Sequence, residues 1–125
     1  MDNEAHFYRC STCGNVVAMM HDGGGKMFCC GHVMPELEGR TGGIGAYEHH
    51  LEVLHENGRL LVRVNDGQHP SERGHRIQWI ALRTTRRLTF RYLKEGARSE
   101  AFFPDVQHGV AYCFCSIHKI WKIVF

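Results

Sequence analysis

Four cysteines near the start of the chain have the types and the spacing that bind a metal ion. Cys10 and Cys13 form a Cys-x2-Cys pair, and Cys29 and Cys30 are adjacent. Two thiolates from a tight turn and two from a facing hairpin arm complete a tetrahedral sulfur site, which holds zinc or iron. Sulfur ligands alone do not separate these metals, and a structural zinc site is the simpler alternative. The adjacent pair can bind one ion only if the backbone bends between its two residues.

A second group of possible ligands, four histidines and one cysteine, lies further along the chain. Cys115 and His118 have a Cys-x2-His spacing, His69 precedes His75 by six residues, and His50 comes earlier. Four imidazoles and one thiolate could ligate a single iron ion and leave a sixth position open for chemistry. A lone histidine in a loop is more often a surface or hydrogen-bonded residue, so spacing alone makes this only a hypothesis.

The elements that position the first group read as a small β module. The apolar runs VVAMM and KMF, separated by Asp22 to Gly25, predict a hairpin of two strands and a glycine turn. About 30 residues cannot bury enough surface to fold unaided, so such a module usually needs a metal or a disulfide. The glycine-rich stretch from Gly39 to Gly45 then reads as a linker.

The remainder alternates in the manner of strands. Asn57-Gly58 predicts a tight hairpin before the run LLVRV, and the run RIQWIAL places Ile77, Trp79 and Ala81 on one face. Several short strands with turn signals between them predict an all-β sandwich of about 85 residues. The expected domains are therefore residues 1–38 and residues 39–125.

Composition limits the classes of protein that these elements can form. The 125 residues are 43% apolar and 22% charged, which is typical of a globular chain, and the net charge of +2 is too small to indicate a nucleic-acid partner. The polar start MDNEAHFYRC lacks the pattern of a signal peptide, and no apolar run approaches the roughly 18 residues of a membrane span. We therefore expect a cytoplasmic protein with no membrane contact and with reduced thiols.

These motifs together resemble those of one known family. The segments YRCSTCGNVV, GGG and CCGHVMPELEG resemble the desulforedoxin-type module of the desulfoferrodoxins. The segments HPSERGHRIQWI and FCSIHKIWK look like the two signature loops of the neelaredoxin-like superoxide reductase domain, and AFFP also matches. The resemblance covers nearly the whole chain. It implies a desulforedoxin-like, rubredoxin-type module followed by a seven-stranded immunoglobulin-like β-sandwich.

The resemblance also implies two iron ions and an activity. One iron would be held by the four cysteines, where zinc is the alternative. The other would have Cys115 as its axial ligand and an equatorial plane of His50, His69, His75 and His118. The open sixth position would bind superoxide, which a superoxide reductase converts to hydrogen peroxide in defence against oxidative stress. An electron donor such as rubredoxin and a homodimeric state are implied as well.

One loop departs from the family pattern. The family typically has Glu-Lys-His-Val-Pro where this chain has Glu48-His49-His50-Leu51-Glu52, so Glu48 and His49 become the candidate catalytic residues. His49 would replace a lysine that attracts superoxide and assists protonation. Since histidine is only partly charged near neutral pH, this predicts slower capture at high pH. His49 could instead be the ligand, but His50 keeps the family's spacing to Val53 and is preferred.

Two other functions fit parts of the pattern. A non-catalytic iron-binding electron-transfer protein on the same fold would explain the lost lysine, because capture of superoxide would be impaired. A zinc-ribbon nucleic-acid module would explain Cys-x2-Cys and the arginines, but leaves the five other ligands unexplained. Cys113, two residues before Cys115, is expected to be a small buried apolar residue, and a redox-sensitive neighbour of the iron is the alternative.

Overall fold

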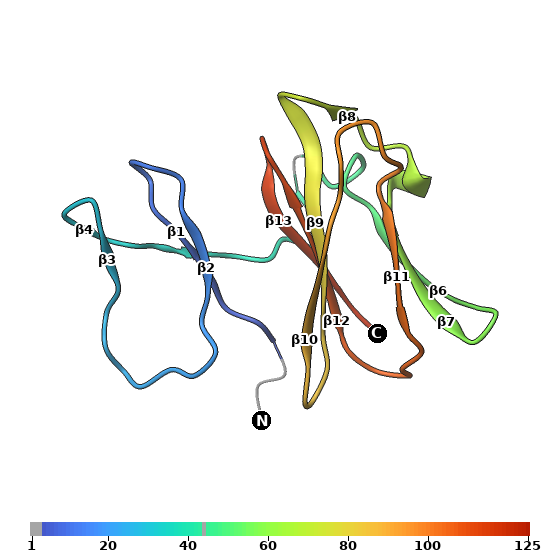
Figure 1. Ribbon diagram of the computed structural model, residues 1–125, viewed down its shortest axis with the longest axis horizontal. Coiled ribbons are helices and arrows are strands. Elements are labelled where there is room, and N and C mark those ends of the chain that lie inside the picture. Colours follow the sequence, from blue (N-terminus) through green and yellow to red (C-terminus); the bar gives the residue numbers. More distant parts are fainter. Residues whose placement is uncertain (1–3, 44) are drawn as a thin grey trace. The chain divides into compact units, whose positions relative to one another are not determined.

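The computed structural model describes residues 4–43 and 45–125, which divide into two compact units, Glu4–Glu38 and Gly39–Phe125 (Figure 1). Met1 to Asn3 of the first expected domain and Ile44 of the expected linker lie outside the described residues. Among the described residues, no helix has the length and apolar character needed to cross a membrane.

The first unit consists of short strands closed by turns at the two cysteine pairs. Strands β2, β1 and β5 form one sheet, and β3 pairs with β4. The bounds are β1 (Phe7–Arg9), β2 (Val16–Ala18), β3 (Phe28–Cys29), β4 (His32–Val33) and β5 (Glu36–Leu37). The expected hairpin between VVAMM and KMF is therefore wrong, because β2 pairs with β1. Tight turns at Cys10–Gly14 and Cys30–Gly31 close the hairpins instead, with φ of 82° at Gly14 and 81° at Gly31.

The second unit is a β-sandwich, and only one short 3-10 helix, η1 (Asn65–Gly67), interrupts its described strands. One sheet has the order β10-β9-β12-β13 with β8 beside β9, and the other has the order β11-β7-β6. Seven of the strands in the described part of this unit have five or more residues, as the family resemblance predicts. The bounds are β6 (Leu51–Glu56), β7 (Arg59–Val64), β8 (Ser71–Glu72), β9 (His75–Arg83), β10 (Leu88–Tyr92), β11 (Glu100–Pro104), β12 (Val110–Cys115) and β13 (Lys119–Val124).

The two sheets pack their apolar faces together to form the core. Alternate residues of β7, Leu60, Val62 and Val64, are fully buried and meet side chains from β9, β11 and β12. The hairpin predicted at Asn57-Gly58 is confirmed. Both residues have positive φ, 52° and 74°, and Glu56 pairs directly with Arg59, as a two-residue turn that follows strand twist requires.

A β-bulge in β9 corrects the expected alternation of that strand. Phe114 pairs with Trp79 but Cys115 pairs with Ile77, so β9 has one extra residue at this point. Ile77 therefore joins the buried core, whereas Trp79 stacks on Phe114 with ring centroids 5.4 Å apart. The expectation that Ile77 shares a face with Trp79 and Ala81 is wrong for this reason.

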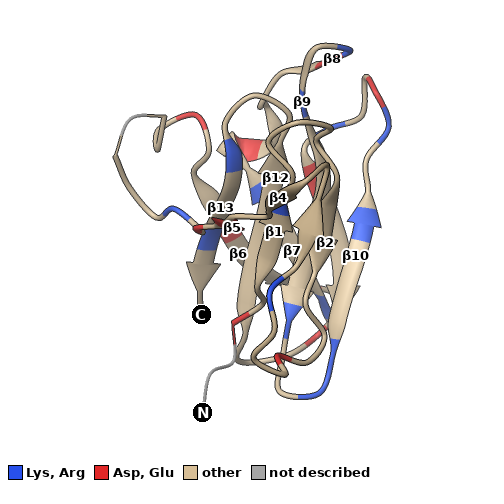
Figure 2. Cartoon of the chain, turned by 90° about the vertical axis from the view of Figure 1, so that its left-hand side faces the viewer, with Lys and Arg blue, Asp and Glu red and all other residues tan. Residues whose placement is uncertain are grey.

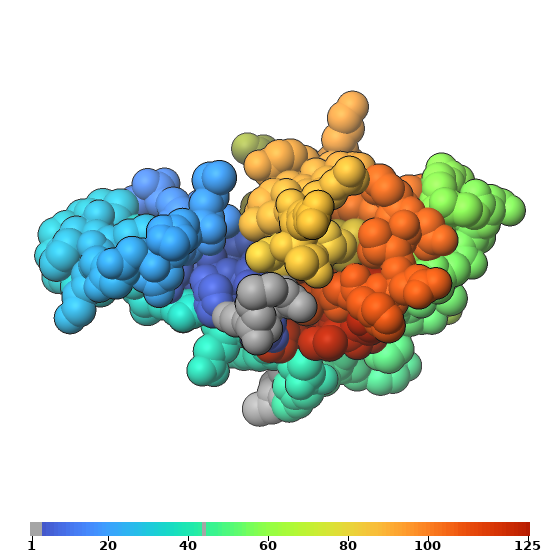
Figure 3. Space-filling model, turned by 90° about the horizontal axis from the view of Figure 1, so that it is seen from below, coloured from blue at the N-terminus to red at the C-terminus, as the bar shows by residue number. Residues whose placement is uncertain are grey.

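The antiparallel order brings five chain segments to one end of the sandwich. These are the segment before β6, the loop after β7, the start of β9, the end of β12 and the turn before β13, at the top of Figure 1. The opposite end, seen from below in Figure 3, is covered by the turns between β9 and β10 and between β11 and β12. The second group of predicted ligands lies on segments of the first end.

Candidate metal centres

The four cysteines of the first unit converge as the sequence predicts. The Sγ atoms of Cys13 and Cys29 are 3.6 Å apart, and those of Cys29 and Cys30 are 4.0 Å apart. All four sulfurs, including Cys10, lie within 4.8 Å of one another. Four sulfurs at about 2.3 Å from a tetrahedral metal are about 3.8 Å apart, so the cluster has the dimensions of such a site.

Backbone conformation explains how two adjacent cysteines reach one ion. Cys30 has φ of 52°, in the left-handed region, and this is the bend that the adjacent pair requires. On the other turn, the backbone N–H of Cys13 donates to Cys10 Sγ at 3.4 Å and lowers the pKa of the Cys10 thiol. A thiolate, the form that binds metal, is therefore favoured at Cys10.

Removal of one sulfur from this cluster should remove its metal. We expect Cys29→Ser to lose the metal of the first unit and the blue-green absorption of a four-thiolate iron, because a hydroxyl is a poor substitute for a soft thiolate. Cys113→Ala, a substitution in the other unit, is the control and should retain both metals. Metal counts per chain and absorption spectra measure both outcomes, and full metal content in Cys29→Ser would contradict the assignment.

Four histidines of the second unit form a closed ring around one point. The ring centroids of His49 and His69 are 4.8 Å apart, those of His69 and His75 are 5.0 Å apart, and those of His75 and His118 are 5.4 Å apart. His118 and His49, at 4.9 Å, close the ring. Four imidazoles in such a cycle could hold one metal ion between them, with His49 opposite His75 and His69 opposite His118.

Two members of this ring have their tautomers fixed by the backbone. Nδ1 of His49 donates to the carbonyl of Gly45 at 2.7 Å, and Nδ1 of His69 donates to the carbonyl of Pro70 at 2.9 Å. Their Nε2 atoms therefore lack a proton and point at each other at 3.1 Å. Two nitrogens at about 2.1 Å and at right angles around a metal are about 3 Å apart, so the pair is placed for ligation.

The pKa values of these two buried imidazoles favour the metal-binding form. Burial lowers the pKa of His49, and it lowers that of His69 to about 4. Both rings are consequently neutral at pH 7, and a neutral imidazole is the form that binds a metal.

The remaining three groups complete the set of five. His75 Nε2 is buried and has no hydrogen-bond partner among the described residues, which is expected of a nitrogen that faces an ion. Cys115 Sγ lies 3.7 Å from His118 Nδ1 and within 4.8 Å of the ligand atoms of His49, His69 and His75. The bulge in β9 accounts for His75, because it turns the start of the strand toward the side on which Cys115 lies.

The structure corrects the choice between the two adjacent histidines. His49 is only 2% exposed and belongs to the ring, whereas His50 is exposed and lies outside it. The backbone carbonyl of His50 accepts the N–H of Asn65 at 2.7 Å. Both ring nitrogens of His49 are occupied, so it has no free charge to offer superoxide. The predicted fall of capture at high pH, which rested on a free His49, loses its basis.

With His49 in the ring, the residue before the ligand is Glu48. A Glu48 carboxylate oxygen lies within 4.8 Å of the ring nitrogens of His49 and His118, and the side chain is exposed to solvent. The family's loop has lysine in front of its ligand, so an acidic group takes the place of a basic one here. The Glu48 carboxylate therefore lies beside the ligand atoms of the ring.

Gly45 and Trp121 also position His49, and both were missed from the sequence. Gly45, which has φ of 87°, accepts both the backbone N–H and the Nδ1–H of His49. Trp121 stacks on the His49 ring at 4.7 Å with the planes 1° apart. The signal in the sequence was Gly45, the last glycine of the predicted linker. A glycine is suited to this position because it adopts a positive φ, and not because the segment must be flexible.

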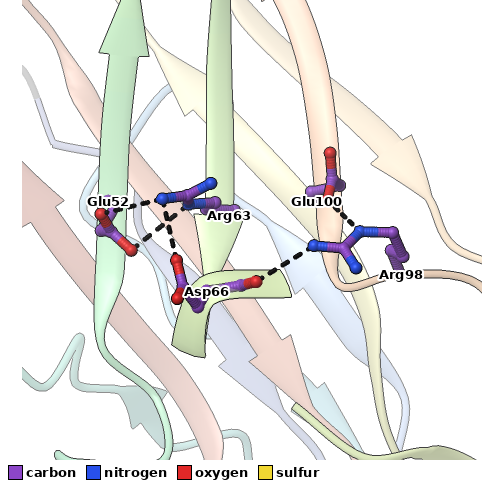
Figure 4. A network of polar contacts seen from close by, with 5 residues as sticks. All are labelled: Glu52, Arg63, Asp66, Arg98 and Glu100. Atoms are coloured by element: carbon purple, nitrogen blue, oxygen red, sulfur yellow. Dashed lines mark hydrogen bonds and ion pairs between the residues drawn. The ribbon is translucent and has the colours of Figure 1, made fainter. Parts of the chain in front are cut away.

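A polar network holds the loop that carries His69 (Figure 4). Arg63 contacts Asp66 at 2.8 Å and Glu52 at 3.3 Å, while Arg98 donates to the Asp66 carbonyl at 3.1 Å and to Glu100 at 2.6 Å. These contacts join β6, β7 and β11 to η1, directly before His69. Buried Ser99 then donates to the backbone carbonyl of His69 at 3.1 Å, which fixes the ligand's main chain.

Cys113 is completely buried in the core beside Cys115, and burial raises the pKa of its thiol. A thiol held neutral in this way is unreactive. The expectation of a small buried residue therefore fits its position.

Comparison with known proteins finds family models that match both units of the chain. Residues 2–37 match the family described as desulfoferrodoxin, N-terminal domain, and residues 46–124 match the family described as desulfoferrodoxin. The chain belongs to the desulfoferrodoxin family. A desulfoferrodoxin of Nitratidesulfovibrio vulgaris is 36% identical, and one of Syntrophotalea carbinolica is 33% identical, each over 98% of both chains. A desulforedoxin of Megalodesulfovibrio gigas is 47% identical over 34 residues, which is 27% of this chain and 92% of that protein.

A solved structure has the same fold over the whole chain. The superoxide reductase from Treponema pallidum superposes with a TM-score of 0.75 and 24% identity, and the match covers 98% of this chain and 99% of that one. The desulfoferrodoxin family and the two ligand sets together give this chain two iron centres, one with four cysteines and one with four histidines and a cysteine. The zinc-ribbon alternative is not supported.

Proposed function

We propose that this desulfoferrodoxin is a superoxide reductase that works at the histidine–cysteine site. The observation that carries the proposal is the closed ring of four imidazoles with the Cys115 sulfur beside it. These five side chains could hold one iron ion and leave room beside it for a small molecule. A ferrous ion held by these residues would supply one electron to superoxide, which with two protons would give hydrogen peroxide.

The protein's own residues prepare this site before any substrate arrives. Hydrogen bonds to the carbonyls of Gly45 and Pro70 hold two rings in orientation, and stacking on Trp121 prevents His49 from turning. Cys115 is fully buried at the end of β12, so its sulfur is shielded from bulk solvent.

Glu48 is the residue that we assign to the approach of the substrate. Its carboxylate lies next to two ligand nitrogens and faces solvent, so it is close to any small molecule that enters from that side. A carboxylate repels an anion and can accept a proton on its way to the product. Glu48 therefore slows capture and assists protonation, which are two separable effects.

The electron donor and the assembly of the protein belong to the same proposal. A small redox protein such as rubredoxin would reduce the ferric iron, and two copies of the chain would form a homodimer in the cytoplasm. Residues 1–38 and 39–125 would each act as one metal-binding domain. Figure 2 shows charges of both signs interspersed along strands and loops, which gives no support for a nucleic-acid partner.

Rapid mixing of the ferrous protein with superoxide tests the activity. We expect fast oxidation of the iron in the histidine–cysteine site, visible as a growing sulfur-to-iron absorption band in the red. The iron in the four-cysteine site should not react on the same time scale, because four sulfurs leave it no open position. Absence of fast oxidation at the first of these sites would favour a non-catalytic electron-transfer protein.

A further inference from the structure

We propose that Lys119 is a positioning residue that holds a positive charge against the Cys115 loop and so raises the reduction potential of the iron. The inference rests on the proposed iron site, but not on its reaction with superoxide. Lys119 follows the ligand His118 directly and begins β13. Three independent features of the residue support the proposal.

The first feature is its backbone conformation. Lys119 has φ of 66°, in the left-handed region that glycine adopts freely and other residues adopt at a cost of about 1 kcal/mol or more. A lysine therefore occupies a position at which glycine would be less strained. Strained residues that persist cluster at functional sites, which directs attention to the side chain.

The second feature is the place of the ammonium group. Lys119 Nζ donates to the backbone carbonyl of Ser116 at 2.8 Å, and it lies 5.8 Å from the centroid of the Phe114 ring. Ser116 and Phe114 are the two chain neighbours of Cys115. The flexible side chain is thus fixed on both sides of Cys115, whose sulfur would bind the iron.

The third feature is the register of the hairpin. Lys119 pairs directly with Cys115 across β12 and β13, and its side chain is half-buried. A charge shielded from water acts over a longer range than one in solvent. Because ferric iron carries one more positive charge than ferrous iron, a cation held near the ligand loop destabilises the ferric form.

The lysine closest to it in sequence is placed differently. The aliphatic part of Lys122 packs where a Cβ on Gly39 would lie, at 2.8 Å from its Cδ, so that side chain extends along the backbone of Gly39. The ammonium of Lys119 contacts the loop between Cys115 and His118. A higher potential keeps the iron ferrous, which is the form that gives an electron to superoxide.

Potentiometric titration of the red absorption band tests this role without superoxide. We expect Lys119→Met to lower the midpoint potential, with about a tenfold rise in the ratio of ferric to ferrous iron at fixed potential. For a one-electron couple, this is 59 mV. Lys119→Arg, which keeps the charge, should stay near the parent value. Lys26→Met removes a lysine from the other unit and is the control for charge.

Lys119→Gly separates charge from backbone strain. It should lower the potential as Lys119→Met does, while it raises the melting temperature of the metal-free protein, because the strain at this position is relieved. Unchanged potentials in Lys119→Met and Lys119→Gly would overturn the proposal, as would a fall in Lys119→Arg as large as in Lys119→Met. If Lys119→Met fails to fold, the midpoint potentials of Lys119→Gly and Lys119→Arg test the proposal in its place. Equal potentials in these two proteins would overturn it.

Discussion

Replacement of His49 by alanine is expected to abolish the red absorption band of the protein, while replacement of His50 leaves it intact. The two residues are adjacent, so they form a matched pair of substitutions. His49 contributes its Nε2 to the ring at 3.1 Å from that of His69, and His50 is exposed outside it. Loss of residues that merely support a ligand weakens metal binding about 10- to 100-fold, and loss of a ligand should weaken it at least as much.

Iron content per chain and the absorption spectrum together distinguish His49 from His50 as the ligand. The His49→Ala protein should retain the iron of the four-cysteine site and lack the other. The His50→Ala protein should bind both. If instead His50→Ala loses the second iron and His49→Ala keeps it, the family spacing to Val53 is the better guide and the ring described above is wrong.

Replacement of Glu48 by lysine is expected to accelerate capture of superoxide. The substitution changes the charge next to the open position by two units, and fields in such sites alter association rates of charged ligands 10- to 1,000-fold. We expect a gain on the order of tenfold at low ionic strength, and a smaller gain for Glu48→Gln. The gain should shrink as salt rises to about 0.1 M, where the Debye length is about 10 Å.

A second glutamate provides the control for total charge. Glu56 is exposed at the turn between β6 and β7, at the other end of the sandwich from the metal ring. Glu56→Lys changes the net charge by the same amount, and we expect it to leave the rate of capture nearly unchanged. An equal acceleration by both substitutions, or none by Glu48→Lys, would show that Glu48 does not control the approach.

The sequence contained most of the site because its motifs are local. Cys10 and Cys13 share one turn, and Cys115 and His118 share another, so chain connectivity alone brings each pair together. The need for a backbone bend at Cys29 and Cys30 also followed from their adjacency, and the structure supplies it through the positive φ of Cys30.

Other features depended on long-range contacts that a linear pattern does not reveal. The choice of His49 over His50 depends on the carbonyl of Gly45 and on the ring of Trp121, more than 70 positions away in the chain. The face of the sheet on which His75 lies depends on the β-bulge in β9. A bulge breaks the two-residue alternation from which the faces of a strand are predicted. In the first unit, the pairing of β2 was predicted wrongly. The run Asp22 to Gly25 is a more obvious turn signal in the sequence than the segment Cys10–Gly14, where the chain in fact turns between β1 and β2.

The yield of hydrogen peroxide from a known amount of superoxide tests the central claim most directly. A reductase supplied with an electron donor forms one peroxide for each superoxide and no dioxygen, whereas dismutation forms one peroxide and one dioxygen from two. We predict the first ratio for the parent protein and for His50→Ala, and none of this activity for His49→Ala. A peroxide yield of one half with release of dioxygen, or full activity in His49→Ala, would contradict the proposed reaction or the proposed site.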